Sequence, residues 1–189
     1  MRLIALFRLT IALIALAGMG CATGATTIDM VPKSYEVAHR NPYGVRVSTG
    51  GGRETQAWSK SEISNENFSA ALADSLSTSG VFSSVVRDGT SDYLLDVFLT
   101  KVDQPIIGLD MTVLVTANWT LTDLKTNAVV FQDLIQGSHT STVGDAFAAV
   151  KRLRLATEGA ARANIAEGIK RMSQLELSPG NNAAIANPK

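Results

Sequence analysis

The segment that decides the fold is Asp110–Thr122, which reads DMTVLVTANWTLT. Apolar side chains occupy every second position, and most of the positions between them are polar. Successive side chains of a β-strand lie on opposite faces of its sheet, so this pattern predicts a strand with one buried and one solvated face. Half-buried alternation also favours antiparallel pairing. The apolar set comprises Met111, Val113, Val115, Ala117, Trp119 and Leu121.

Neighbouring segments extend the same signal in both directions. Asp92–Val102 alternates with Tyr93, Leu95, Val97 and Leu99 on one face. After a predicted turn at Asp123–Asn127, residues 128–139 are expected to return as a partner strand. Tyr43–Ser48 and Val81–Arg87 are shorter strand candidates. The sequence therefore predicts a sheet of about five strands.

Two helices are predicted around this sheet. Ser59–Glu62 has the spacing of a capping box, and the helix after it should end at Ser79-Gly80. A second helical segment spans Asp145–Leu175, with Thr142 as a capping residue, and its continuity past Gly159 is left open. One apolar stripe along it comprises Val150, Leu153, Ala161, Ile165, Gly168, Met172 and Leu175. The predicted fold class is α+β, a two-layer sandwich with a mostly antiparallel sheet and two helices on one face.

The N-terminus has the layout of a secretory signal. Arg2 and Arg8 precede an apolar stretch of about 12 residues, which is shorter than the roughly 20 residues of a membrane-spanning helix. Small residues and Cys21, the only cysteine of the chain, follow it. Gly18-Met19-Gly20-Cys21 resembles the lipobox of bacterial lipoproteins, although leucine is usual where Gly18 stands. The resemblance implies lipidation, including palmitate, at Cys21, and Ala22 after it favours sorting to the outer membrane.

The chain divides into four parts by composition. Residues 1–20 are the expected signal peptide, and residues 21–34, small and polar, are the expected lipidated tether. Residues 35–177 should form the periplasmic α+β domain, and residues 178–189 a disordered tail.

Composition excludes several functional classes. The 189-residue chain has 17 basic and 17 acidic residues, so it lacks the positive charge with which nucleic-acid binders meet phosphates. One cysteine and two histidines cannot supply the ligands typical of a structural zinc site, and no metal or cofactor is expected. Loss of Arg2 and Arg8 with the signal peptide leaves a net charge of −2.

Several motifs of the domain resemble a family of small, uncharacterised proteobacterial envelope lipoproteins. They are Trp58–Asn65, Asp103–Pro105, Gly108–Val113, Arg152–Ala156, Glu158–Arg162 and Asn164-Ile165. Some members of that family carry a UDP-N-acetylglucosamine acyltransferase label. Such acyltransferases resemble hexapeptide-repeat β-helices, and the present sequence has no hexapeptide period, so that activity is not expected. The order of elements is also similar to that of auxiliary lipoproteins of envelope transport systems.

Four groups of residues are candidates for a site. Arg154 and Glu158 lie one turn apart within the apolar half of the last helix, which predicts a structural ion pair, with ligand recognition as the alternative. Ile106 and Ile107 at a hairpin tip either contact a partner or a membrane, or pack under the sheet edge. His139, with serines and aspartates nearby, lacks the G-x-S-x-G elbow of a hydrolase. Gly50–Arg53 lacks the lysine of a phosphate-binding loop and is expected to be a flexible connection.

The sequence thus predicts an outer-membrane lipoprotein that acts as a non-enzymatic binding or assembly module in the envelope. Its expected partners are outer-membrane lipid, through Cys21, and an envelope protein whose identity the residues do not reveal. The alternative is an enzyme that modifies envelope lipid or sugar. No catalytic residue is assigned.

Overall fold

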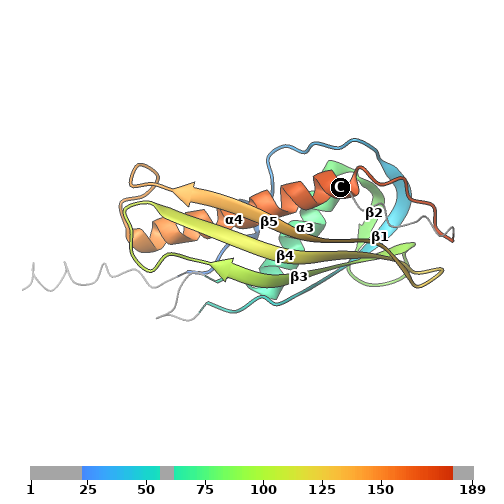
Figure 1. Ribbon diagram of the computed structural model, residues 1–189, viewed down its shortest axis with the longest axis horizontal. Coiled ribbons are helices and arrows are strands. Elements are labelled where there is room, and N and C mark those ends of the chain that lie inside the picture. The colour runs from blue at the N-terminus through green and yellow to red at the C-terminus, as the bar shows by residue number, and fades with distance from the viewer. Residues whose placement is uncertain (1–22, 56–61, 181–189) are drawn as a thin grey trace, which may run out of the picture.

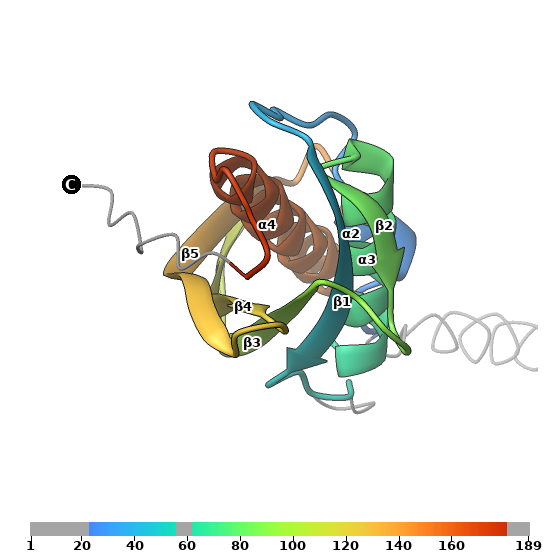
Figure 2. The ribbon, with the colours of Figure 1, turned by 90° about the vertical axis from the view of Figure 1, so that its right-hand side faces the viewer.

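The computed structural model describes residues 23–55 and 62–180 of the chain. A five-stranded sheet, in the order β2-β1-β3-β4-β5, is covered by helices (Figures 1 and 2). Buried side chains of the helices and strands form one core. The α+β class and the five strands are therefore confirmed. The strands are β1 Asn41–Gly50, β2 Phe82–Val86, β3 Tyr93–Asp103, β4 Met111–Asp123 and β5 Ala128–Ser141. The helices are α2 Thr27–Met30, α3 Asn65–Ser79 and α4 Ala149–Met172.

The sheet is mixed. β3, β4 and β5 form an antiparallel meander, whereas β1 runs parallel to both β2 and β3. The parallel pairs arise because α3 carries the chain across the sheet between β1 and β2. A parallel pair needs such a crossover, whereas a tight turn joins antiparallel strands. Alternation in a short strand does not by itself reveal this difference.

β4 forms the centre of the core. All six apolar residues of its predicted inner face are buried, and Trp119 is completely so, which confirms the face assignment. Trp119 Nε1 donates a hydrogen bond to Asn164 Oδ1 of α4 at 3.1 Å. Asn164 Nδ2 in turn donates to the Ile135 carbonyl of β5 at 2.7 Å. The buried polar groups that join helix to sheet thus satisfy one another.

The ends of α3 show one correct and one wrong prediction. Gly80 follows the helix in the left-handed conformation, with φ 63°, and its N–H donates to Leu76, as the predicted terminus requires. The helix begins at Asn65, where Ser64 Oγ accepts from the Asn67 N–H at 3.2 Å. The proposed capping box was wrong: Ser64 caps the helix, Glu62 precedes it outside any helix or strand, and residues 59–61 fall outside the described residues.

α4 is continuous over its 24 residues, and it begins later than predicted. The Asp145 carboxylate accepts from the Thr142 N–H at 2.7 Å, so these residues stabilise a turn of their own instead of capping the helix. Arg152 is buried on α4, where its guanidinium donates to the carbonyls of Ala146 and Phe147 at 2.9 and 2.6 Å. Val150, assigned to the apolar stripe, is exposed.

The segment predicted as a tether packs on the domain in its described part. Ala25 and Met30 are buried in the core, and α2 contacts both α3 and α4. At the other end of the chain, the Gly180 N–H donates to Asp123 Oδ2 at 2.7 Å. The predicted signal peptide, Cys21 and residues 181–189 of the predicted tail lie outside the described residues.

Candidate functional site

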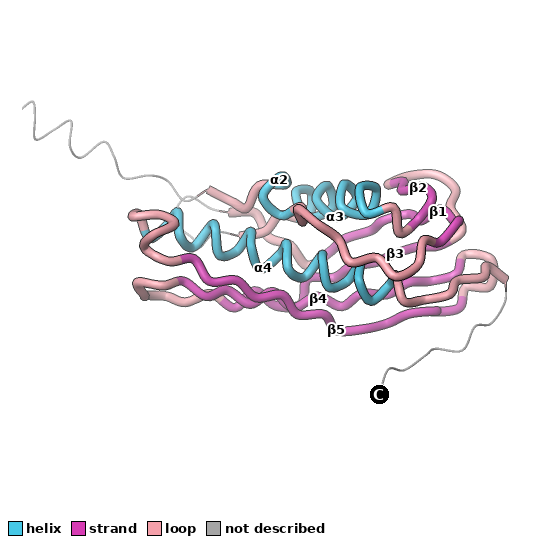
Figure 3. The backbone as a smooth tube through the Cα atoms, turned by 90° about the horizontal axis from the view of Figure 1, so that it is seen from above, coloured by secondary structure: helices cyan, strands magenta, loops and turns pink. Residues whose placement is uncertain are grey.

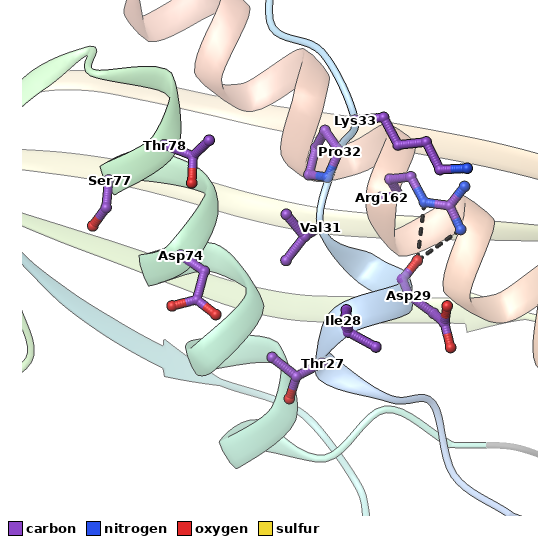
Figure 4. Close-up of a pocket in the computed structure, with 10 residues that line it drawn as sticks. All are labelled: Thr27, Ile28, Asp29, Val31, Pro32, Lys33, Asp74, Ser77, Thr78 and Arg162. Carbon is purple, nitrogen blue, oxygen red and sulfur yellow. Dashed lines mark hydrogen bonds between the residues drawn. The ribbon is translucent and has the colours of Figure 1, made fainter.

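A groove of about 770 Å³ lies between α2, α3 and the middle of α4. Asp74, Ser77 and Thr78 project from α3 on one side. The other side is formed by Arg162 with Thr27, Ile28, Asp29, Val31, Pro32 and Lys33 (Figure 4). Arg162 donates from Nε and Nη2 to the Asp29 carbonyl at 2.9 and 2.7 Å. This double hydrogen bond fastens α2 to α4 and thereby fixes one wall of the groove.

The groove presents a mixed surface. Ile28 is 80% exposed beside it, while Lys33 and Asp74 contribute charges of opposite sign. Its polar side chains are solvated at its rim. A surface of this kind suits a polypeptide segment with alternating apolar and polar contacts better than a small molecule, which prefers an enclosed apolar pocket.

A second hollow of about 610 Å³ lies where β1 ends beside β3. Gly51 adopts φ +78° there, and a Cβ on it would stand 2.1 Å from the Leu99 carbonyl oxygen, so only glycine fits. The Gly52 N–H donates to Asn65 Oδ1 at 2.7 Å. The loop is therefore hydrogen-bonded to α3 through its backbone, as is typical of a structural connection.

The predicted ion-pair residues meet on α4. Arg154 Nε lies 3.5 Å from Glu158 Oε1, a charge contact longer than a normal hydrogen bond. Glu158 Oε1 also accepts from the Thr26 N–H at 2.9 Å, while Arg154 Nη1 donates to Thr23 Oγ1 at 3.0 Å. Both residues thus hold the N-terminal segment against α4. Sequence patterns do not predict this contact, because Thr26 and Glu158 are 132 positions apart.

Glu158 is the buried titratable group of this region. Burial raises its pKa above the ordinary value, and the Thr26 hydrogen bonds and the Arg154 charge act in the opposite direction. Glu158 is fully buried, and within the described part of the chain its Oε2 has no hydrogen-bond partner. The carboxyl faces packed protein and not the groove lining, so its geometry is that of a structural group.

Ser138 and Asp133, which lie near His139 in the sequence, interact with other residues. His139 is exposed at the end of β5 and packs against Gly159 of α4. Ser138 Oγ donates to the Val113 carbonyl at 3.2 Å, and Asp133 forms an ion pair with Arg171. Within the described residues, no hydrogen bond joins His139 to Ser138 or Asp133, so these three side chains form no triad.

Ile106 and Ile107 are 86% and 89% exposed at the tip between β3 and β4. This exposure excludes the alternative that the two isoleucines pack under the sheet edge. Over residues 23–55 and 62–180, no group of three or more potential metal ligands comes together. None of the helices in those ranges is both long and apolar enough to cross a membrane.

Comparison with solved structures places the fold among small bacterial proteins. Protein XCC0632 from Xanthomonas campestris, of the family-model DUF330, matches over 80% of this chain and 95% of its own, with a TM-score of 0.62 and 15% identity. The hypothetical protein CT253 from Chlamydia trachomatis matches over 69% and 98%, with a TM-score of 0.50 and 9% identity. A minor lipoprotein from Acinetobacter baumannii matches over 69% and 90%, with a TM-score of 0.47 and 10% identity.

The likenesses to XCC0632 and CT253 show the fold, at identities too low to transfer a function. No protein-family model matches the sequence, and no curated protein matches it either.

Proposed function

We propose that this protein is a lipid-anchored lipoprotein of the outer membrane whose periplasmic domain acts as a non-enzymatic binding or assembly module. The observation that carries the proposal is Cys21 at the end of a signal-like segment, preceded by Gly20 and followed by Ala22. A thiol in this position is suited to thioether lipidation, and multiple acyl chains hold a protein stably on a bilayer.

The domain itself supports a binding role. The groove between α2, α3 and α4 is bordered by a segment that hydrogen bonds fix in place, so its shape exists before a partner arrives. Preformed surfaces lose less conformational entropy on binding. Glu158, a buried carboxyl, lies outside the groove lining and accepts from the Thr26 N–H; this supports a role in the fold and favours a binding module over an enzyme that would expose such a group to substrate.

Photo-crosslinking in intact envelopes tests the binding role. A photoreactive amino acid at Ser77, within the groove lining, should give one discrete protein adduct. The same amino acid at Leu134, which is 55% exposed on β5, serves as the control and should not give that adduct. Absence of a groove-specific adduct, or identical adducts from both positions, would contradict the groove as the binding surface.

A further inference from the structure

One end of the domain gathers most of its exposed apolar side chains. Of ten large apolar side chains exposed in the described residues, six lie in the β3–β4 loop, in the β5–α4 loop or in the first turn of α4. We call this set the apolar end; it comprises Ile106, Ile107, Leu109, Val143, Phe147 and Val150. Ile107 and Phe147 are 89% and 93% exposed, which is costly in water unless the surface is covered.

Topology places both loops together. Met111, the first residue of β4, pairs with Ser141, the last residue of β5, so the loops that adjoin these residues leave the sheet at the same end. Figures 1 and 3 show the two loops and the start of α4 at one extremity of the elongated molecule.

The N-terminal segment approaches the same end. Thr23 is hydrogen-bonded to Arg154, Thr26 to Glu158, and Asp29 to Arg162, so the chain runs parallel to α4. Traced from Asp29 back to Thr23, the chain therefore leads toward the first turn of α4.

The remaining distance to the lipid attachment point is short. Arg154 lies five residues after Ala149, about 7.5 Å along the helix axis. Cys21 precedes Thr23 by two residues, which span at most about 7 Å of backbone. The acyl chains of a lipidated Cys21 must consequently enter the bilayer close to the apolar end.

We infer that the apolar end inserts into the headgroup and upper acyl region of the leaflet that holds the lipid of Cys21. This inference rests on the proposed lipid anchor. The anchor keeps the loops at high effective concentration at the bilayer surface, so that a few apolar side chains suffice for stable contact. The exposed charges nearby, Asp110, Asp145 and Lys151, would remain at the level of the headgroups. α4 then rises from the membrane and carries the groove into the periplasm.

Site-directed fluorescence tests the inference on the full lipoprotein. Cys21 is the only cysteine, and its sulfur is blocked once lipidated, so a single introduced thiol can be labelled with an environment-sensitive NBD probe. Ile107→Cys and Phe147→Cys report on the apolar end. Ile28→Cys and Leu134→Cys are matched controls, exposed by 80% and 55% on other faces. Each labelled protein is reconstituted into vesicles of phosphatidylethanolamine and phosphatidylglycerol.

We expect a blue-shifted emission at positions 107 and 147, with quenching by nitroxide-labelled lipid and protection from aqueous iodide. At the control positions 28 and 134, the emission should not be blue-shifted, nitroxide-labelled lipid should not quench it, and aqueous iodide should quench it. Iodide quenching equal at all four positions, in protein whose Cys21 lipid is verified by mass, would overturn the inference and leave the anchor intact. Protection from iodide without quenching by lipid would overturn it in favour of a protein partner. Protein without lipid on Cys21 would overturn both the inference and the proposed anchor.

Discussion

Replacing Arg154 by methionine tests whether its ion pair with Glu158 stabilises the fold. Loss of one partner from a fully buried pair costs about 3–5 kcal/mol, whereas exposed pairs contribute about 0–1 kcal/mol. Here Glu158 is fully buried, but the Arg154 side chain is 25% exposed and the contact is 3.5 Å long. We therefore expect an intermediate loss of about 2 kcal/mol, which lowers Tm by about 4–8 °C in a domain of this size.

The loss of stability caused by Arg154→Met should depend on pH. Burial raises the pKa of Glu158 above its ordinary value of 4.5, so the stability that this carboxyl contributes is complete below 4.5 and is lost as pH rises through the folded pKa. Arg154→Met removes a charge that lowers this pKa, so the folded pKa rises further. The difference between wild type and variant should therefore be small near pH 4 and grow to its full value at neutral pH.

Urea denaturation of the wild type, the single variant and the double variant Arg154→Met with Glu158→Gln provides the assay. The double variant keeps an acceptor for the Thr26 N–H and removes the buried charge, so it should recover most of the loss. A single variant as stable as the wild type at pH 7 would refute a structural pair. Equal losses in both variants would refute the unpaired carboxylate as the cause.

Three further changes probe the core and the chain end by denaturation. Trp119→Ala should cost about 3–5 kcal/mol because Trp119 is completely buried, and an unchanged urea midpoint would contradict the face assignment of β4. Gly137→Ala should lower the free energy of unfolding by about 1–3 kcal/mol, since the new Cβ would stand 2.2 Å from the backbone nitrogen of Asn164. Gly144→Ala is the control and should be almost neutral, because the nearest atom to its Cβ is a side-chain hydroxyl at 3.4 Å. Equal losses in the two variants would refute the clash at Gly137. Backbone N–H donors lower the pKa of Asp123, so Asp123→Asn should be less stable at pH 7, with the gap closing as pH falls below 3.8; a gap independent of pH would contradict this.

Periodic features were predictable from sequence because their signal repeats. In β4, six apolar residues at period two define a face that no local alternative explains. The start of α3 was not predictable in the same way, because several serines precede it at similar spacings. Only the folded chain distinguishes Ser64, whose hydroxyl caps the helix, from the serines before it.

Long-range contacts account for the other differences. The segment before β1 is small and aperiodic, yet Met30 is buried because α3 and α4 supply a place for it. Arg152 is buried because two carbonyls of the preceding loop accept its guanidinium, which a helical-angle argument does not include. The ion-pair residues were identified from spacing, whereas the attachment of Arg154 to Thr23 and of Glu158 to Thr26 required the structure.

The chemical state of the mature N-terminus decides whether the protein is lipid-anchored. Protein extracted from outer-membrane fractions with detergent is digested, and its N-terminal peptide is sequenced by mass spectrometry. A lipid-anchored protein should yield a peptide that begins at Cys21, lacks residues 1–20 and carries acyl chains on the cysteine. A peptide with an unmodified Cys21, or a mature chain that begins at another residue, would contradict the lipid anchor on which the proposed function depends.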